Sequence, residues 1–154
     1  MKDKIPTLID ICSKFNYNLI LSGSFADYFW LNYQDVEDFD FIVDYAFFND
    51  FIQQNTEIMK DFFERYALKH RIENKRLSRY FYSGYQVDIF AQEIVQKNEV
   101  VMLDKHPILV TPPDIRLNNL INHKYVKSKM PEEVYDRKIK KVNERIESYK
   151  KLLS

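Results

Sequence analysis

Hydrophobic residues recur along the first part of the chain with two different periods, and these periods predict helices alternating with strands. Apolar residues follow Pro6 at three- and four-residue spacing, which predicts a first helix over about residues 5–16. The apolar run 19–22 ends at Gly23, as a buried strand that stops at a tight turn does. Residues 25–33 are again typical of a helix. The chain is therefore expected to open as helix, strand and helix.

The middle of the chain carries patterns of both kinds. Residues 38–44 alternate, which predicts a strand with its acidic side chains on one face and aromatic or aliphatic ones on the other. The apolar residues of the segment 47–68 suit one long helix or two short ones. Two β-rich runs, 77–82 and 85–90, are joined by a two-residue Ser-Gly link of the kind that closes a hairpin.

The C-terminal part predicts a further strand or strand pair and then helices. Residues 100–103 and 108–111 are short apolar runs, and the two prolines that follow stop any strand and begin a helix reaching about residue 125. Pro131 and two glutamates then begin a last helix with lysines near its C-terminal end, as the helix dipole favours. The whole pattern predicts an α+β fold with C-terminal helices.

Length and composition limit the kinds of protein this can be. A chain of 154 residues suits one domain, 1–154, with a core of about 5–111 and a C-terminal helical segment of about 112–154. Apolar residues make up 45% and aromatics 16%, which argues against disorder. The single Cys12 excludes an internal disulfide and a cysteine-cluster metal site. Neither a membrane span nor a signal peptide is recognisable, so we expect a soluble cytoplasmic protein without a membrane partner.

Charge is unevenly distributed although the net charge is zero. Residues 1–61 contain 4 Lys and Arg against 11 Asp and Glu, whereas residues 114–154 contain 11 against 6. Two solvated surfaces of unlike sign would explain this. An acidic metal-binding centre flanked by basic surface that attracts a polyphosphate or nucleic acid would also explain it.

Three short motifs carry candidate chemistry. The first is Gly23-Ser24, where a strand leads into a helix; such a junction presents backbone N–H groups and the Ser24 hydroxyl to an anion, unless it is an ordinary turn with Ser24 as a helix cap. The second is Asp38-Phe39-Asp40, which places two carboxylates on one face of a strand, a pair suited to Mg²⁺ or, alternatively, to water at a strand end.

The third motif is Asp88, a lone carboxylate inside an apolar strand. A buried carboxylate needs a cation, a basic partner or solvent, and Arg79 on the preceding hairpin strand is the alternative to a metal. A basic cluster over residues 65–79 precedes the hairpin and could contact a triphosphate or an RNA, or form a solvated loop.

Together, the motifs resemble those of the nucleotidyltransferase superfamily related to DNA polymerase β, over about residues 5–90. The resemblance implies a mixed sheet packed against helices, with Gly23 and Ser24 at the triphosphate of a nucleoside triphosphate. It also implies that Asp38, Asp40 and Asp88 bind Mg²⁺ (or Mn²⁺) and carry catalysis. The downstream helix resembles that of resistance and toxin–antitoxin nucleotidyltransferases, which makes Lys124 a nucleotide-binding candidate. Glu37 departs from the family, many of whose members place Ser or Thr there.

We therefore expect a magnesium-dependent transfer of a nucleoside monophosphate to a hydroxyl acceptor, which could be RNA, protein or a small molecule. A catalytically inactive binding or regulatory module with the same fold, within a toxin–antitoxin or phage-encoded system, is the first alternative. An RNA-binding protein that uses the basic C-terminal helices is the second. The amphipathic last helix can pack on its own domain or on a second copy in a homodimer.

Overall fold

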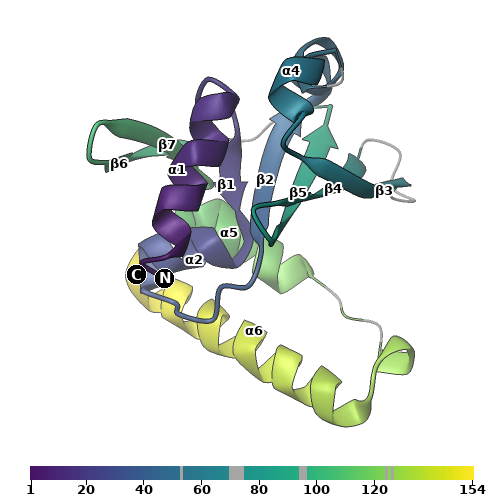
Figure 1. Cartoon of the computed structure of the whole chain (residues 1–154). Coiled ribbons are helices and arrows are strands. Elements are labelled where there is room, and N and C mark those ends of the chain that lie inside the picture. The colour runs from purple at the N-terminus through teal and green to yellow at the C-terminus, as the bar shows by residue number, and fades with distance from the viewer. Residues whose placement is uncertain (53, 70–74, 94–96, 124, 126) are drawn as a thin grey trace.

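A seven-stranded mixed sheet forms the centre of the molecule (Figure 1). The computed structural model describes residues 1–52, 54–69, 75–93, 97–123, 125 and 127–154. The strands are β1 Ile20–Ser22, β2 Phe39–Asp44, β3 Phe63–Lys69, β4 Lys75–Tyr82, β5 Tyr85–Gln92, β6 Glu99–Leu103 and β7 His106–Val110. Their order across the sheet is β3-β4-β5-β2-β1-β7-β6. The pairs β1–β7 and β2–β5 are parallel and the other neighbours are antiparallel.

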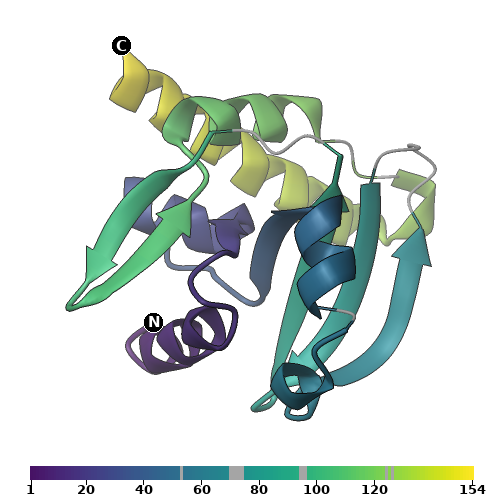
Figure 2. The same cartoon turned by 90° about the horizontal axis from the view of Figure 1, so that it is seen from above.

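Helices pack against this sheet and against one another. They are α1 Lys4–Lys14, α2 Gly23–Leu31, α3 Tyr45–Phe47, α4 Thr56–Met59, α5 Pro113–Asn122 and α6 Glu132–Leu153, with a π-helical turn at Phe48–Ile52 and a 3-10 turn at Lys127–Lys129. Figure 1 shows α6 as the long yellow helix below the sheet, and Figure 2 shows α5 alongside it. Helix α2 lies between the sheet and the α5–α6 pair, because it contacts β1 and β2 as well as both helices.

The core follows from the alternation of the central strands. In β2, Phe39, Phe41 and Val43 are buried, whereas the alternate residues Asp40 and Asp44 point to the other face. The buried face packs against α1 and α2 in one large apolar cluster. A second, smaller cluster joins α5 and α6 through residues that include Leu120, Val142 and Tyr149.

The predicted mixed sheet packed against helices, with C-terminal helices, is confirmed, and so are most of its elements. The Ser83-Gly84 link closes the β4–β5 hairpin with both residues at positive φ, as a tight two-residue turn requires. The helix predicted to reach about residue 125 is shorter in the structure, where α5 ends at Asn122. None of the helices in the described part of the chain has the length and apolar composition needed to cross a membrane.

The prediction of helix over residues 47–68 is wrong in its second half. Helical structure ends with α4, and Phe63–Lys69 forms the edge strand β3, which pairs antiparallel with β4. Apolar spacing in this segment fits a helix, but the free edge of β4 offers a complete row of backbone partners. Sheet pairing therefore decides the structure, as tertiary contacts often override local preference.

Candidate functional site

A row of polar side chains crosses four strands on one face of the sheet. Arg79 on β4 is the register partner of Asp88 on β5, Asp88 is the partner of Asp40 on β2, and Asp40 is the partner of Ser22 on β1. Residues in register on neighbouring strands point to the same face, so these four side chains lie side by side. The sequence-predicted Asp40 and Asp88 are therefore brought together on adjacent strands.

Asp38 joins this row from the residue just before β2. The Nε2 amide of Gln86 donates to Asp38 Oδ2 at 3.2 Å and to Asp88 Oδ2 at 3.4 Å. Gln86 lies two residues before Asp88 on β5, so its side chain occupies the same face. One neutral amide thus links two of the three predicted acids.

Asp40 is the least compensated of the three. Among the described residues no hydrogen bond or ion pair reaches its carboxylate. Burial, together with the charges of Asp88 and Asp38, raises the pKa of Asp40 to about 7. Burial, followed by the charges of Asp88 and Glu37, also raises the pKa of Asp38. Such carboxylates are stabilised by any cation that enters between them.

Asp88 is compensated by Arg79. Arg79 Nε donates to Asp88 Oδ1 at 2.8 Å, and a second guanidinium nitrogen donates to Oδ2 at 2.9 Å. The Asp88 side chain is 6% exposed and that of Arg79 is 23% exposed. The basic partner that the sequence offered as the alternative to a metal is therefore present, and it lies beside the other two acids rather than away from them.

The glycine turn sits directly against Asp40. Gly23 begins α2 with φ +61°, a conformation that favours glycine, and a Cβ placed there would collide with Asp40 Oδ2 and lie 3.0 Å from Asp40 Cβ and Cγ. Helix α2 has Ser22 as its N-cap residue, so Ser24 is not the helix cap that the sequence allowed as an alternative. Ser24 instead lines a cavity beside the acidic residues.

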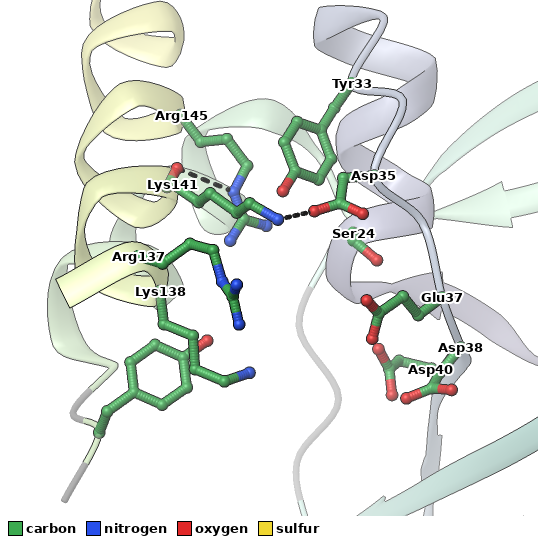
Figure 3. A pocket seen from close by; sticks show the side chains of 11 residues that line it. Ser24, Tyr33, Asp35, Glu37, Asp38, Asp40, Arg137, Lys138, Lys141 and Arg145 are labelled. Atoms are coloured by element: carbon green, nitrogen blue, oxygen red, sulfur yellow. Dashed lines mark hydrogen bonds and ion pairs between the residues drawn. The ribbon is translucent and has the colours of Figure 1, made fainter. Parts of the chain in front are cut away.

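This cavity has an acidic wall and a basic wall. Its volume is about 470 Å³. The acidic wall comes from the segment leading into β2 and from β2 itself, and the basic wall comes from α6, which presents its side chains across the gap (Figure 3). The lining residues are Ser24, Tyr33, Asp35, Glu37, Asp38, Asp40, Tyr125, Arg137, Lys138, Lys141 and Arg145. A ligand that fits between the walls must satisfy both signs of charge.

A buried ionic network fixes the position of α6 and hence of the basic wall. Asp27 of α2 is fully buried and accepts two hydrogen bonds from Arg116 of α5, at 2.8 and 2.9 Å. It also accepts hydrogen bonds from Arg145, at 2.8 Å, and from the hydroxyl of Tyr149, both on α6. The Arg145 guanidinium lies over the Tyr33 ring, 4.7 Å from its centroid.

The charge of Asp27 is well compensated. Burial alone would raise its pKa, but the hydrogen bonds and charge of Arg116, the Tyr149 hydroxyl and the charge of Arg145 outweigh burial and lower it. Asp27 is therefore a structural anion, in contrast to Asp40. At the cavity rim Lys141 pairs with the exposed Asp35 (Figure 3).

The acidic residues fit a divalent cation in part. Carboxylate oxygens are the donors that Mg²⁺ and Mn²⁺ prefer, and Asp40 is left without a partner within the described chain. However, within the described residues no group of three or more His, Cys, Asp or Glu side chains is arranged to hold a metal ion. At Asp88, Arg79 already donates to both carboxylate oxygens. Asp38 and Asp40 are thus the pair best placed to receive a cation.

Part of this site is predictable from the sequence and part is not. Lys124 lies outside the described residues. So do 70–74 in the basic cluster, and the side chains of 65, 69, 75 and 76 are likewise not described. In the sequence the basic wall of α6 is visible as net charge, and the spacing of 137, 138, 141 and 145 also places these residues on one helical face. Gln86 could have been found by its two-residue spacing from Asp88.

Comparison with known proteins assigns no family to the chain. No family model matches it, and no curated protein matches it. Among solved structures it is similar to a crystal structure described as a "putative nucleotidyltransferase from H. pylori". The match has 13% sequence identity and a TM-score of 0.45, and it covers 80% of this chain and 62% of that chain. The chain thus spans less than two thirds of the length of that protein.

Proposed function

We propose that this protein is a metal-dependent nucleotidyltransferase, which moves a nucleoside monophosphate from a nucleoside triphosphate to a hydroxyl acceptor. The observation that carries the proposal is the cavity with two walls, in which Asp38 and Asp40 face the basic side chains of α6 across a gap. A metal–triphosphate complex has matching features, because its cation seeks carboxylates and its phosphates seek Lys and Arg.

In this proposal, Asp38 and Asp40 hold Mg²⁺ (or Mn²⁺). When bound, the cation neutralises charge on the phosphates and favours attack by the acceptor hydroxyl. The unpartnered Asp40 and its raised pKa support this assignment, since a cation offsets both causes of the raised pKa, the burial of the carboxylate and its repulsion by Asp88 and Asp38. Asp88 completes the acidic set beside Asp40, and its ion pair with Arg79 compensates its charge in the resting protein.

The triphosphate lies between the walls. Arg137 and Lys138 contact its phosphates from α6, since neither makes an ion pair with the described residues. Gly23 and Ser24 present a backbone without a side chain and a hydroxyl at the start of α2, where the helix dipole favours an anion. The chain therefore positions the reacting phosphate by charge from one side and by a close backbone approach from the other.

The first test is binding of the four nucleoside triphosphates to the full chain, measured by calorimetry with and without Mg²⁺. We expect Mg²⁺-dependent binding that Asp38→Asn and Asp40→Asn each weaken by about tenfold or more, as loss of a metal ligand does. Asp50→Asn is the matched control, because Asp50 is exposed and outside the cavity. Binding that is equal with EDTA, or unchanged in both variants, would contradict the proposal.

The second test is release of pyrophosphate from the bound triphosphate, with RNA, the protein itself and small polyols offered as acceptors. Transfer that Asp38→Asn and Asp40→Asn abolish supports an enzyme. The bidentate Arg79–Asp88 pair favours one competing function, a nucleotide-binding module without catalysis, because it keeps the third acid engaged. Tight Mg²⁺-dependent binding without pyrophosphate release for any acceptor would indicate that module.

A further inference from the structure

The ion pair between Arg79 and Asp88 belongs to the sheet itself. The two residues are direct register partners on the antiparallel strands β4 and β5, so a guanidinium reaches the carboxylate without crossing any other element. Both bonds are short, at 2.8 and 2.9 Å, and together they use both oxygens of Asp88. This fork geometry is the strongest form of carboxylate pairing that a side chain offers.

A second group occupies the space between Asp88 and Asp38. The Gln86 amide nitrogen is a hydrogen-bond donor to both carboxylates, at 3.4 and 3.2 Å. A cation shared by Asp38 and Asp88 would have to displace this amide and also compete with the guanidinium. By contrast, within the described chain no donor has to be displaced from Asp40.

The three acids of this site thus differ in whether a positively charged side chain compensates them. Asp38 and Asp40 make no ion pair with the described residues, whereas Asp88 carries a bound positive charge that a second cation would duplicate. Placing a divalent cation beside the Arg79 guanidinium, which is itself largely buried, would add repulsion that water screens poorly.

We propose that Arg79 takes the place of a second cation at Asp88, so that the resting site binds one divalent ion, held by Asp38 and Asp40. This inference rests on the proposed function and specifies the metal content of the same site. It follows that Arg79 is a positioning residue, which controls whether Asp88 can become a metal ligand. A second ion enters only when the guanidinium leaves Asp88.

The test is the number of Mn²⁺ ions bound by the full chain, from the loss of the free-ion signal in electron paramagnetic resonance. We expect one site in the natural protein and in Lys14→Gln, a control that removes an exposed ion pair away from the cavity. Arg79→Gln removes the positive charge and should reveal a second Mn²⁺ site. Its affinity for Mn²⁺ should be about tenfold or more above that of the same position in the natural protein, the scale of outer-shell effects. Adding Asp88→Asn to Arg79→Gln should return the count to one.

Each outcome is informative. Two Mn²⁺ ions of similar affinity in the natural protein would overturn the inference and leave the proposed function standing. No Mn²⁺ in the natural protein would overturn both. If Arg79→Gln does not fold, Arg79→Lys keeps the charge but loses the fork, and it should strengthen the second site by a smaller factor. A single site of unchanged affinity in every folded Arg79 variant would also overturn the inference.

Discussion

At the scale of single residues, Asp27 and Asp40 show how the same side chain takes two different roles in one molecule. Asp27 is fully buried, yet three donor side chains surround it and lower its pKa. Asp40 is partly buried beside other acids, without a donor from the described chain, and its pKa is raised to about 7. A buried carboxylate with donor partners stabilises the fold, whereas a carboxylate without such partners and with a raised pKa is a candidate binding group.

The raised pKa of Asp40 predicts how stability depends on pH when no metal is present. Because the folded-state pKa lies above the ordinary value of 3.8, folding favours the protonated acid; this stabilising contribution is complete below pH 3.8 and is lost as the pH rises through about 7. Asp40→Asn removes the dependence. We expect the free energy of unfolding of the variant, relative to that of the natural protein, to increase by about 1–2 kcal/mol from pH 4 to pH 8, a value reduced for partial exposure.

Urea denaturation in EDTA at both pH values measures this difference. Asp50→Asn serves as the control, because its exposed carboxylate should leave the pH dependence unchanged. A variant-minus-natural difference that is the same at pH 4 and pH 8 would contradict the prediction. Adding Mg²⁺ should restore stability to the natural protein at pH 8 more than at pH 4.

Gly23 provides a second residue-scale prediction. Gly23→Ala places a Cβ against Asp40 and a side chain at positive φ, so it should lower the free energy of unfolding by about 2–3 kcal/mol. Gly84→Ala is a matched control, since φ there is +82° but nothing lies within 4 Å of the added Cβ; its cost should be about 1 kcal/mol. Equal losses for the two variants, measured by thermal unfolding, would show that contact with Asp40 is unimportant.

At the same scale, the sequence predicted the acids better than their partners. Two carboxylates at i and i+2 on a strand must share a face, so Asp38 and Asp40 could be placed together from local geometry alone. That Asp88 lies next to Asp40 depends on the parallel pairing of β2 with β5, which no local pattern specifies. The unpartnered state of Asp40 and the bridging amide of Gln86 depend on the same pairing.

At the scale of elements, the buried network around Asp27 fastens α6 to α2 and α5. Asp27→Asn keeps the shape but removes the charge that Arg116 and Arg145 both require. Breaking a buried ion pair from one side leaves uncompensated charge, so we expect the free energy of unfolding to fall by about 3–5 kcal/mol. Hydrogen exchange should increase across α6 before it increases in the strands, because α6 loses its anchor.

A matched control uses a second ion pair of α6, which joins Lys141 to Asp35 in the segment before β2. Lys141 and Asp35 are both more than a third exposed, so Asp35→Asn should change the free energy of unfolding by less than about 1 kcal/mol. Chemical denaturation of both variants gives the comparison. Similar small losses for Asp27→Asn and Asp35→Asn would mean that the buried network does not hold α6 in place.

Helices and strands could be predicted from the sequence where a single spacing of apolar residues or a clear turn signal is present. Helices α1 and α6 carry clear apolar stripes, and the β4–β5 hairpin has its Ser-Gly turn, so their residues specify them locally. Segment Phe63–Lys69 has no such signal. It forms strand β3 by pairing antiparallel with β4, whose edge offers unpaired backbone groups. This pairing is a property of the sheet and not of the segment.

At the scale of the whole molecule, the uneven charge of the sequence becomes two facing walls. Folding brings the acidic stretch before and within β2 opposite α6, from the basic C-terminal part of the chain. The sequence predicted the imbalance and left the juxtaposition as one of two explanations, because no local pattern shows that α6 packs on α2 and α5. Opposed walls of unlike sign should bind ligands that carry both a cation and several anionic groups.

The basic wall therefore predicts a local effect of charge reversal. Arg137→Glu and Lys138→Glu place negative charge in the cavity, so each should weaken Mg²⁺-dependent triphosphate binding by about tenfold or more at low salt, and the difference should shrink at high salt through screening. Lys140→Glu and Lys151→Glu make the same change in net charge on a part of α6 that does not line this cavity. Titrations at 50 and 300 mM salt distinguish the two pairs of variants. If the attraction is purely long-range, all four variants should lose the same affinity for the triphosphate. If the phosphates contact the cavity wall, Arg137→Glu and Lys138→Glu should lose more affinity than the other two.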